Sequence, residues 1–479
     1  MIKGFLSLYR PSYLRTLVYM LQNVEYQPKP YLQWYWRTHD FGDVMHRRSL
    51  DRTKAARLLL ALLRIGTLLQ IGFGGLLIYL GLSQRLIGGV AFGAAVLIIY
   101  PLLWAHAVLL PLVIARQTMV KPKDRRSIAH SRKTFAKHPG VKIAVAGSYG
   151  KTTMKELLNT VLSEGLKVAA TPANKNVSSS HAVFAKKLHG DEDVLIIEYG
   201  EGQPGDVARF AAITKPTHAI ITGLAPAHLD RYKTLKAAGK DIFSVAEYLR
   251  GEHVYVNDEA VSVKPFLRRT YKLFNSHGAL GWKAQNISVT LEGTSFTLQK
   301  GKESLKLHTK LLGRHQVGYL SLVVALGLEL GLTTEQAQAG VANTQPFEHR
   351  MQPYQLSAAW VIDDTYNGNL EGIRAGTQLL ADLKAKRKIY VSPGLVDQGP
   401  ETEAVHVEMG QLIAAAQPDI IVLMRNSVTT FIERGLSEAN FKGELRIEPV
   451  PLDFYTNLSH FVAAGDLVLM QNDWTDNYA

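Results

Sequence analysis

The chain has 479 residues, enough for two or three domains with cores of their own, and it contains no cysteine, which excludes disulfides and cysteine-based zinc sites. Its formal net charge of +13 is confined to two segments. Residues 1–57 carry ten basic and four acidic side chains, and residues 116–137 carry eight and one. Residues 138–479 hold 34 basic and 36 acidic side chains, so we expect no nucleic-acid partner.

The first 56 residues show no catalytic pattern. Apolar side chains recur at helical spacing through residues 5–21, and Trp34, Tyr35 and Trp36 stand beside Arg37. Aromatic side chains next to cations favour the headgroup region of a bilayer. We interpret residues 1–56 as an amphipathic, interfacial region, with a cap packed on the soluble body as the alternative.

Two apolar stretches follow, residues 58–82 and 86–115. The first is interrupted only by Arg64 and Gln70, and the second contains no charged residue. Each is long enough to cross a hydrocarbon core of ~30 Å, which needs ~20 helical residues. We therefore predict a transmembrane helical hairpin over residues 57–116, with a buried pair of soluble helices as the alternative.

The basic flanks on both sides of the hairpin predict its orientation. By the positive-inside rule both outer ends lie in the cytoplasm, and only the short turn lies outside. We expect a multi-pass protein of the cell membrane, with membrane lipid as a partner and with its catalytic domains in the cytoplasm.

From residue 141 onward, short apolar strands alternate with amphipathic helices, which predicts an α/β fold with parallel sheets. The first series has strands at residues 194–198, 218–222 and 253–257, antiparallel strands between residues 287 and 311, and helices over residues 315–342. A second series begins near residue 346, with strands at residues 360–364, 388–392, 420–424 and 467–470. We expect a central domain over residues 117–345 and a C-terminal α/β domain over residues 346–479.

The segment around residue 150 has the pattern of a phosphate-binding loop between a strand and a helix. Its glycines let the backbone turn around an anion, Lys151 would reach the β- and γ-phosphates, and Thr152 would offer its hydroxyl to Mg²⁺. A strict consensus has glycine where this chain has Val145, so a chance loop is the alternative. The pattern predicts that ATP is bound by Gly147, Ser148, Tyr149, Gly150, Lys151, Thr152 and Thr153.

Two further side chains follow neighbouring strands. Glu198 ends the strand at residues 194–198, and His228 comes soon after the next strand. The carboxyl ends of parallel strands meet at the ligand-binding edge of a sheet. Glu198 is therefore a candidate Mg²⁺ ligand and His228 lies at the same edge; the alternatives are a surface acid and a structural histidine.

From about residue 141 to its end, the chain resembles the Mur ligase family, ATP-dependent amide-forming enzymes of peptidoglycan precursor synthesis. The resemblance rests on separated motifs in order, at residues 147–153, 171–176, 198, 228–232, 348–350 and 363–369. It implies a P-loop central domain of the Mur ligase type and a Rossmann-like C-terminal domain. Residues 393–395 and 406–410 are similar to the branch that adds D-alanyl-D-alanine to a UDP-muramoyl tripeptide.

The resemblance also implies site residues. Asn174 and Asn176 lie in the family's asparagine-bearing loop, and Arg350 and Asp364 match residues that contact ATP and its ribose. Gln316 stands where the family has an asparagine that reads adenine.

Catalytic roles follow in the same way. The resemblance implies that Mg²⁺ is held by Thr152, Glu198 and His228, and that Lys151 and His228 are catalytic. Lys240 lies one position from the place of a family lysine that is often carbamylated, and it is the third catalytic candidate. The hairpin stands in place of the family's UDP-binding domain.

We expect a membrane-anchored ligase that uses ATP and Mg²⁺ to join an amino acid or dipeptide to a small-molecule cell-wall precursor. D-alanyl-D-alanine is the expected amine donor. The alternatives are a ligase that extends a lipid-linked or polyglutamate acceptor, and a membrane-tethered nucleotide-binding module without ligase activity. Protein partners are left open.

Overall fold

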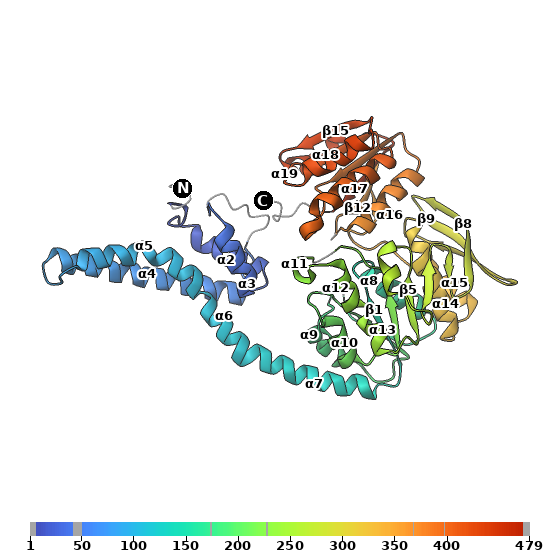
Figure 1. Cartoon of the computed structure of the whole chain (residues 1–479), viewed down its shortest axis with the longest axis horizontal. Helices are drawn as coiled ribbons and strands as arrows, with labels where there is room; N and C mark the ends of the chain where they lie inside the picture. The colour runs from blue at the N-terminus through green and yellow to red at the C-terminus, as the bar shows by residue number, and fades with distance from the viewer. Residues whose placement is uncertain are drawn as a thin grey trace. The chain divides into compact units, whose positions relative to one another are not determined.

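The computed structural model describes residues 6–41, 50–172, 175–226, 229–366, 368–396 and 398–472. The chain forms two compact units, the first ending at Arg126 and the second beginning at Ser127. Their border falls within helix α7 (Lys121–Lys137), which is drawn in cyan in Figure 1.

Two long apolar helices dominate the first unit. α4 (Lys54–Leu82) packs along α5 (Gly89–Ala107), and α6 (Leu109–Ala115) and a π-helical turn (Arg116–Val120) continue into α7. Glycines allow the close packing, because a Cβ atom on Gly93 would lie 2.5 Å from the carbonyl oxygen of Gly74. The predicted helical hairpin is confirmed, and two of its helical segments are long and apolar enough to cross a membrane.

Two shorter helices cover the end of the hairpin. α2 (Tyr13–Asn23) and α3 (Pro28–Arg37) share a core with α4, α5 and α6. The buried hydroxyls of Tyr13 and Tyr31 donate hydrogen bonds to carbonyl oxygens of α5, at Pro101 (3.1 Å) and Ala105 (3.0 Å). The apolar helix face predicted within residues 5–21 is therefore covered by the hairpin itself, an arrangement that we did not expect from the sequence.

A ten-stranded sheet forms the centre of the second unit, in the order β10-β9-β8-β7-β6-β5-β4-β1-β3-β2. Six strands are parallel to one another: β1 (Val141–Ala146), β2 (Val168–Ala170), β3 (Val194–Glu198), β4 (His218–Ile221), β5 (Val254–Asn257) and β6 (Lys272–Asn275). An antiparallel extension adds β7 (Gly278–Ala279), β8 (Trp282–Thr290), β9 (Gly293–Lys300) and β10 (Glu303–Thr309).

Helices cover both faces of this sheet (Figure 1). One core packs α8 (Lys151–Leu162), α14 (His315–Glu329) and α15 (Thr334–Ala342) against it. The other face packs against the end of α7 and against α9 (Ser178–Ala185), α10 (Asp206–Thr214), α12 (Leu235–Ile242) and α13 (Ser244–Tyr248). The short helix α11 (Leu229–Tyr232) precedes α12, and a 3₁₀ helix (Val261–Phe266) follows β5. Apolar residues of the parallel strands point into both cores, as expected for a sheet that is buried on both sides.

A second, six-stranded sheet has the order β11-β12-β16-β13-β14-β15. Its strands are β11 (Gln352–Leu356), β12 (Ala359–Asp364), β13 (Arg387–Ser392), β14 (Ile420–Met424), β15 (Glu444–Glu448) and β16 (Asp466–Gln471), of which only β11 is antiparallel. Its helices are α16 (Leu370–Asp382), α17 (Thr402–Ala415), α18 (Thr429–Glu438), α19 (Pro451–Thr456) and α20 (Leu458–Phe461), with a 3₁₀ turn at Gly399–Glu401. The predicted α/β fold class is confirmed; β11 and β15 were not predicted, since their residues are mostly polar or half exposed.

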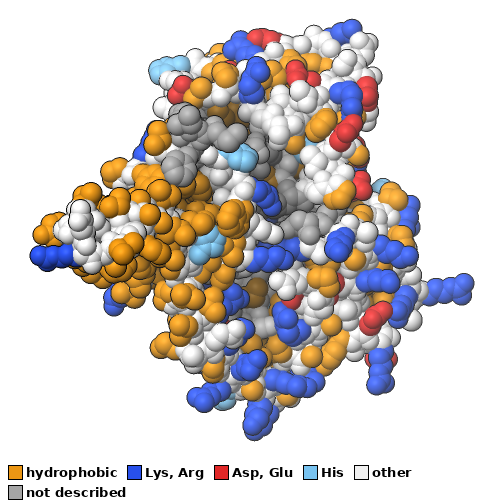
Figure 2. Space-filling model, turned by 60° about the vertical axis from the view of Figure 1, so that its left-hand side comes forward, with side chains coloured by type: hydrophobic (Ala, Val, Ile, Leu, Met, Phe, Trp, Pro, Cys, Tyr) orange, Lys and Arg blue, Asp and Glu red, His pale blue; other side chains and the backbone are white. Residues whose placement is uncertain are grey.

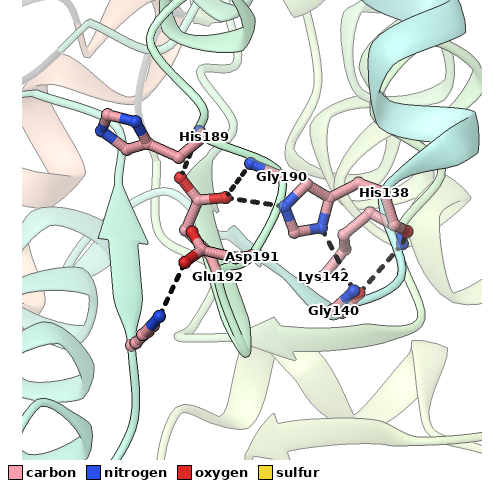
Figure 3. A network of polar contacts seen from close by, with 8 residues as sticks. His138, Gly140, Lys142, His189, Gly190, Asp191 and Glu192 are labelled. Carbon is pink, nitrogen blue, oxygen red and sulfur yellow. Dashed lines mark hydrogen bonds and ion pairs between the residues drawn. The ribbon is translucent and has the colours of Figure 1, made fainter.

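A polar network holds the junction where α7 leads into β1 (Figure 3). His138 donates through Nε2 to the carboxylate of Glu192 (2.9 Å) and accepts through Nδ1 from the backbone N–H of Gly140 (3.1 Å). Glu192 also accepts the backbone N–H groups of His189 (2.7 Å) and Gly190 (2.8 Å). Burial opposes the ionisation of Glu192, but these hydrogen bonds outweigh it and lower its pKa to about 2.

We predict that Glu192→Gln lowers the Tm of the protein by about 2–5 °C at pH 7, because glutamine offers its three donors a single acceptor oxygen and no charge. Since the folded-state pKa is depressed, the contribution of Glu192 is present above its ordinary pKa of 4.5 and is lost as the pH falls towards 2. Thermal melting from pH 7 to pH 3 should show the difference between variant and wild type shrinking. Asp191→Asn, in the exposed pair with Lys167, is the control and should change Tm little.

Candidate functional site

The loop between β1 and α8 turns sharply at two glycines. Gly147 and Gly150 have backbone φ angles of +141° and +71°, which residues other than glycine rarely adopt. A Cβ atom on Gly147 would collide with the hydroxyl of Thr222, and one on Gly150 with the hydroxyl of Tyr319. α8 begins at Lys151, so the unpaired N–H groups of its first turn lie at the loop, as in an anion-binding site.

Lys151 is held in this loop by two acceptors. Its Nζ donates to the carbonyl oxygen of Gly147 (2.5 Å) and forms an ion pair with Glu201, at 2.8 Å and 3.0 Å from the two carboxylate oxygens. The Lys151 side chain is 12% exposed and that of Glu201 is 5% exposed. The phosphate-loop cation therefore has a nearly buried carboxylate as its partner.

Glu198, at the end of β3, lies beside the start of α8. Its Oε1 accepts hydrogen bonds from the hydroxyl of Thr152 and the side-chain amide of Asn176, both at 3.2 Å. Its Oε2 is buried without a hydrogen-bond partner, and the nearest cation is Lys155 Nζ at 3.6 Å. A carboxylate and a hydroxyl side by side, with one carboxylate oxygen free of hydrogen bonds, suit a hard cation such as Mg²⁺.

A buried histidine on α9 holds the end of β3 through a hydrogen bond to its main chain. His181 Nε2 donates to the main-chain oxygen of Glu198 (2.8 Å), and its ring packs against Tyr199 and Phe210. Burial lowers the pKa of His181 to about 4, so it is neutral at pH 7 and adds no charge beside Glu198.

The second sheet contributes an arginine in an unusual turn. The guanidinium of Arg350 lies over the ring of Tyr366, 4.6 Å from its centre. The residues on either side, His349 and Met351, have φ angles of +58° and +48°. His349 Nδ1 contacts Asp363 at 2.7 Å, which ties this turn to the end of β12. The turn thus places Arg350 just before β11, where it lines the cavity described below.

Asp364 lies next to this turn. Its carboxylate accepts hydrogen bonds from the side-chain amide of Gln471 (2.8 Å) and from the backbone N–H of Met351 (3.3 Å). Although part of the residue remains exposed, protein atoms surround the carboxyl group. This burial outweighs the hydrogen bonds and the charge of Arg350, and it raises the pKa of Asp364 to about 7.

Lys151, Thr152, Glu198, Glu201 and Arg350 meet in one cavity of about 390 Å³, which Asp364 and His181 do not line. The phosphate loop, the loop after β3 and the C-terminal domain all line it, through Ser148, Tyr149, Gly150, Lys151, Thr152, Asn176, Val177, Glu198, Gly200, Glu201, Gly202, Asp206, Pro226, Arg350, Tyr366, Gly368, Asn369, Val396 and Gln398. Residues predicted as one site from distant parts of the sequence therefore surround a common space. The segments after β1 and β3 meet there because neighbouring parallel strands of one sheet end at the same edge, and the segments around β12 come from the second sheet.

Three residues that we predicted to bind the nucleotide do not point their side chains into the cavity. The side chain of Tyr149 is turned away to pack against Gly223, so the loop presents mainly its backbone. Thr153 is buried within α8. Gln316 is buried at the start of α14, does not line the cavity, and has a side-chain oxygen without a hydrogen-bond partner. Such an oxygen suits the exocyclic amine of adenine, and the role of Gln316 stays a prediction.

Other predicted residues are not among the described residues that line the cavity. Gly147 belongs to the loop and Asp364 lies beside the Arg350 turn, but neither lines the cavity, so their contacts with the nucleotide stay predictions. Lys240 is exposed on α12 and does not line the cavity, so its catalytic role stays a prediction. Asn174 and His228 lie outside the described residues.

Several site residues were missed from the sequence. Glu201 is three residues after Glu198 in a glycine-rich loop, and this second acid was the available signal. Lys155 is four residues after Lys151, on the same face of α8, and is fully buried. His181 and Gln398 carried no local signal, because only the tertiary fold brings them to the site.

We predict that Asp364→Asn removes a pH dependence of stability. The folded-state pKa of Asp364 is raised from 3.8 to about 7, so the folded protein keeps a proton that the unfolded chain releases. Wild-type stability should therefore fall as the pH rises from about 4 to about 7, by up to about 1.4 kcal/mol for each tenfold drop in proton concentration. Thermal melting across pH 4–8 should show a flatter profile for the variant. Parallel profiles for the two proteins would contradict the prediction.

The part of the chain that holds the phosphate loop is similar to known proteins. Residues 145–327 match the Mur ligase middle domain. The UDP-N-acetylmuramoyl-tripeptide–D-alanyl-D-alanine ligase of Escherichia coli K12 is 30% identical over 294 residues, which are 59% of this chain and 64% of that enzyme. The enzyme of the same name from Bacillus subtilis is 24% identical over 339 residues, covering 69% of this chain and 72% of the relative. The match thus spans just under two thirds of the Escherichia coli relative.

Solved structures show the same fold. MurF from Thermotoga maritima, solved in complex with ADP, superimposes with a TM-score of 0.64 at 18% identity, covering 73% of this chain and 80% of that one. MurF from Acinetobacter baumannii gives a TM-score of 0.61 at 21% identity, covering 72% and 76%. The resemblance predicted from the motifs is confirmed: the chain carries a Mur ligase middle domain within a Mur ligase fold.

Proposed function

We propose that this protein is an ATP-dependent ligase of peptidoglycan precursor synthesis that forms an amide bond and releases ADP and phosphate. The observation that carries the proposal is the single cavity in which Lys151, the Thr152–Glu198 pair and Arg350 converge. Relatives that share the middle domain are named as ligases that join D-alanyl-D-alanine to a UDP-muramoyl tripeptide.

The chemistry explains why these side chains are needed. A carboxylate is a poor acyl donor, so its oxygen first attacks the γ-phosphorus of ATP to form an acyl phosphate and ADP. An amine then attacks the acyl carbon, and phosphate leaves through a tetrahedral intermediate. Most of the catalytic work in phosphoryl transfer is positioning and charge stabilisation. Lys151 and the N-terminal amides of α8 would face the phosphates, and Arg350 would approach from the C-terminal domain.

The residues present also fit Mg²⁺. Thr152 and Glu198 would hold the ion, since both offer oxygen atoms and Glu198 Oε2 is buried without a hydrogen-bond partner. When bound, the ion would neutralise charge on the phosphate oxygens. Asn176 orients the carboxylate through its 3.2 Å hydrogen bond. His228 remains a proposed second ligand from the family motif.

D-alanyl-D-alanine is the amine donor that we propose, on the basis of the relatives and of one loop. The loop at residues 393–395 is fixed by His406, whose Nε2 accepts the backbone N–H of Leu395 at 2.9 Å. His406 is fully buried, so it shapes this loop rather than contacting a substrate. A lipid-linked or polyglutamate acceptor, and a nucleotide-binding module without ligase activity, are the alternatives.

We predict that Lys151→Ala reduces ADP formation at least about 100-fold with muramoyl tripeptide and D-alanyl-D-alanine, because it removes the cation at the transferred phosphate. ADP release by the purified full-length chain is the measurement. Lys167→Ala, which removes an exposed lysine from a surface pair, is the control and should keep wild-type turnover. Wild-type turnover by Lys151→Ala would exclude the phosphate loop from the mechanism.

We also propose that α4 and α5 cross the membrane and hold the ligase at its cytoplasmic face. Figure 2 shows hydrophobic side chains covering the helices of the hairpin. Only 17% of the apolar window in α4 and 22% of that in the helical segment from Gly89 to Lys137 is buried, whereas a core helix of a soluble protein is mostly buried. Inside the hairpin, Gln70 accepts from Trp104 (2.7 Å) and donates to the carbonyl of Val96 (3.0 Å), so this amide is satisfied without water.

We predict that the full-length chain sediments with membranes, stays there in 1 M salt and is released by detergent. Salt screens the attraction of basic flanks to anionic lipid but does not extract a spanning helix. A chain beginning at Lys121 should be soluble and should still bind ATP, since it keeps both sheets. Recovery of the full-length chain in the soluble fraction without detergent would contradict the proposed spans.

A further inference from the structure

The ion pair between Lys151 and Glu201 lies inside the cavity that the proposed function assigns to ATP. Both side chains line the cavity and both are nearly buried. The lysine that should bind phosphate is therefore already neutralised by the protein's own carboxylate. An incoming phosphate group must compete with Glu201 for Lys151.

Glu201 differs from the other carboxylates of the cavity by its partner. Among the described lining residues, Glu198 lies 3.6 Å from Lys155 and Asp206 lies 2.5 Å from Arg209, and neither cation lines the cavity. Of the described carboxylates that line the cavity, only Glu201 takes its counter-ion from the phosphate loop itself. Removing its charge should therefore change the phosphate affinity of the loop more than removing either of the others.

Displacement of Glu201 has an electrostatic consequence. Once phosphate oxygens contact Lys151, the Glu201 carboxylate is left in a nearly buried site beside a multiply charged anion. Like charges at such short range repel strongly where water is excluded. A nucleotide that arrives with its own divalent cation brings the charge that offsets this repulsion, whereas a metal-free nucleotide or free phosphate does not.

We propose that Glu201 is a specificity-determining residue that makes the phosphate loop select magnesium-bound nucleotide over metal-free nucleotide and inorganic phosphate. This inference rests on the proposed function, because it takes the cavity to be the ATP site. Gly200 and Gly202 flank Glu201, so the local backbone can adjust when the carboxylate leaves Lys151.

The test is nucleotide binding to the full-length chain in detergent, without acceptor or amine, so that no turnover occurs. Isothermal titration with ADP and ATP would compare Mg²⁺ with EDTA for wild type and for Glu201→Gln, which keeps the shape and removes the charge. Wild type should bind at least about tenfold more weakly in EDTA. Glu201→Gln should bind metal-free nucleotide about tenfold more tightly than wild type and magnesium nucleotide within about threefold of wild type.

Two further measurements sharpen the result. Asp206→Asn removes a carboxylate from the same cavity without touching Lys151 and should keep the wild-type ratio of affinities. Inorganic phosphate should raise the Tm of Glu201→Gln but not that of wild type, because only the variant has an unneutralised Lys151.

Unchanged metal-free affinity in Glu201→Gln would overturn the proposal. So would a selective loss of affinity for magnesium nucleotide, which would make Glu201 a metal ligand instead. If wild type binds neither nucleotide under either condition, the proposed ATP site itself is wrong, and this outcome is distinct from the other two.

Discussion

The sharp turn from β1 into α8 is the constraint on which the candidate site depends. Gly147 and Gly150 take left-handed conformations in a space bounded by the side chains of Thr222 and Tyr319. The hydroxyl of Thr222, the residue after β4, also donates to the carbonyl oxygen of Tyr149. The end of β4, which neighbours β1 in the sheet, therefore holds the loop in place. Because the turn is fixed in this way, the start of α8 directs its free N–H groups and Lys151 towards the edge where β3 delivers Glu198.

Charge is balanced within this site before any ligand is considered. Lys151 is paired with Glu201, and Lys155 with both Glu156 (3.0 Å) and Glu198 (3.6 Å). Buried charges are costly to desolvate, so each needs a partner of opposite sign, which these ion pairs supply. The same pairing means that ligand binding exchanges one set of ion pairs for another. Selectivity then depends on which charges the ligand brings with it.

The two compact units meet different physical demands. In the second unit, helices bury both faces of the large parallel sheet, and apolar side chains face inward. In the first unit, α4 and α5 bury their glycines against each other and leave large apolar side chains such as Leu68, Phe73 and Phe92 exposed. Polar groups are satisfied where they occur, as for the hydroxyls of Tyr13 and Tyr31. This inversion supports the proposed membrane spans, because helix association in an apolar solvent relies on close backbone packing and internal hydrogen bonds.

The sequence by itself determined the local elements and their chemical types. Runs such as those at residues 194–198 and 420–424 became buried parallel strands with the predicted bounds, because apolar strands of this length have few other ways to exclude water. The phosphate loop was predictable because its glycines, lysine and threonine are contiguous. β15 was missed because an edge strand with exposed side chains carries no apolar run.

Only the tertiary structure decided which distant residues share the site. The pairing of Glu201 with Lys151, the buried Lys155 and the support of β3 by His181 depend on contacts across 17–50 residues of sequence, and no local pattern encodes these contacts. The raised pKa of Asp364 likewise depends on burial beside Gln471, which lies on another strand more than 100 residues away. Residue type and spacing specify strands, helices and turns, because those depend on near neighbours along the chain. Burial and counter-ions are properties of the packed whole, so they exist only once the chain has folded.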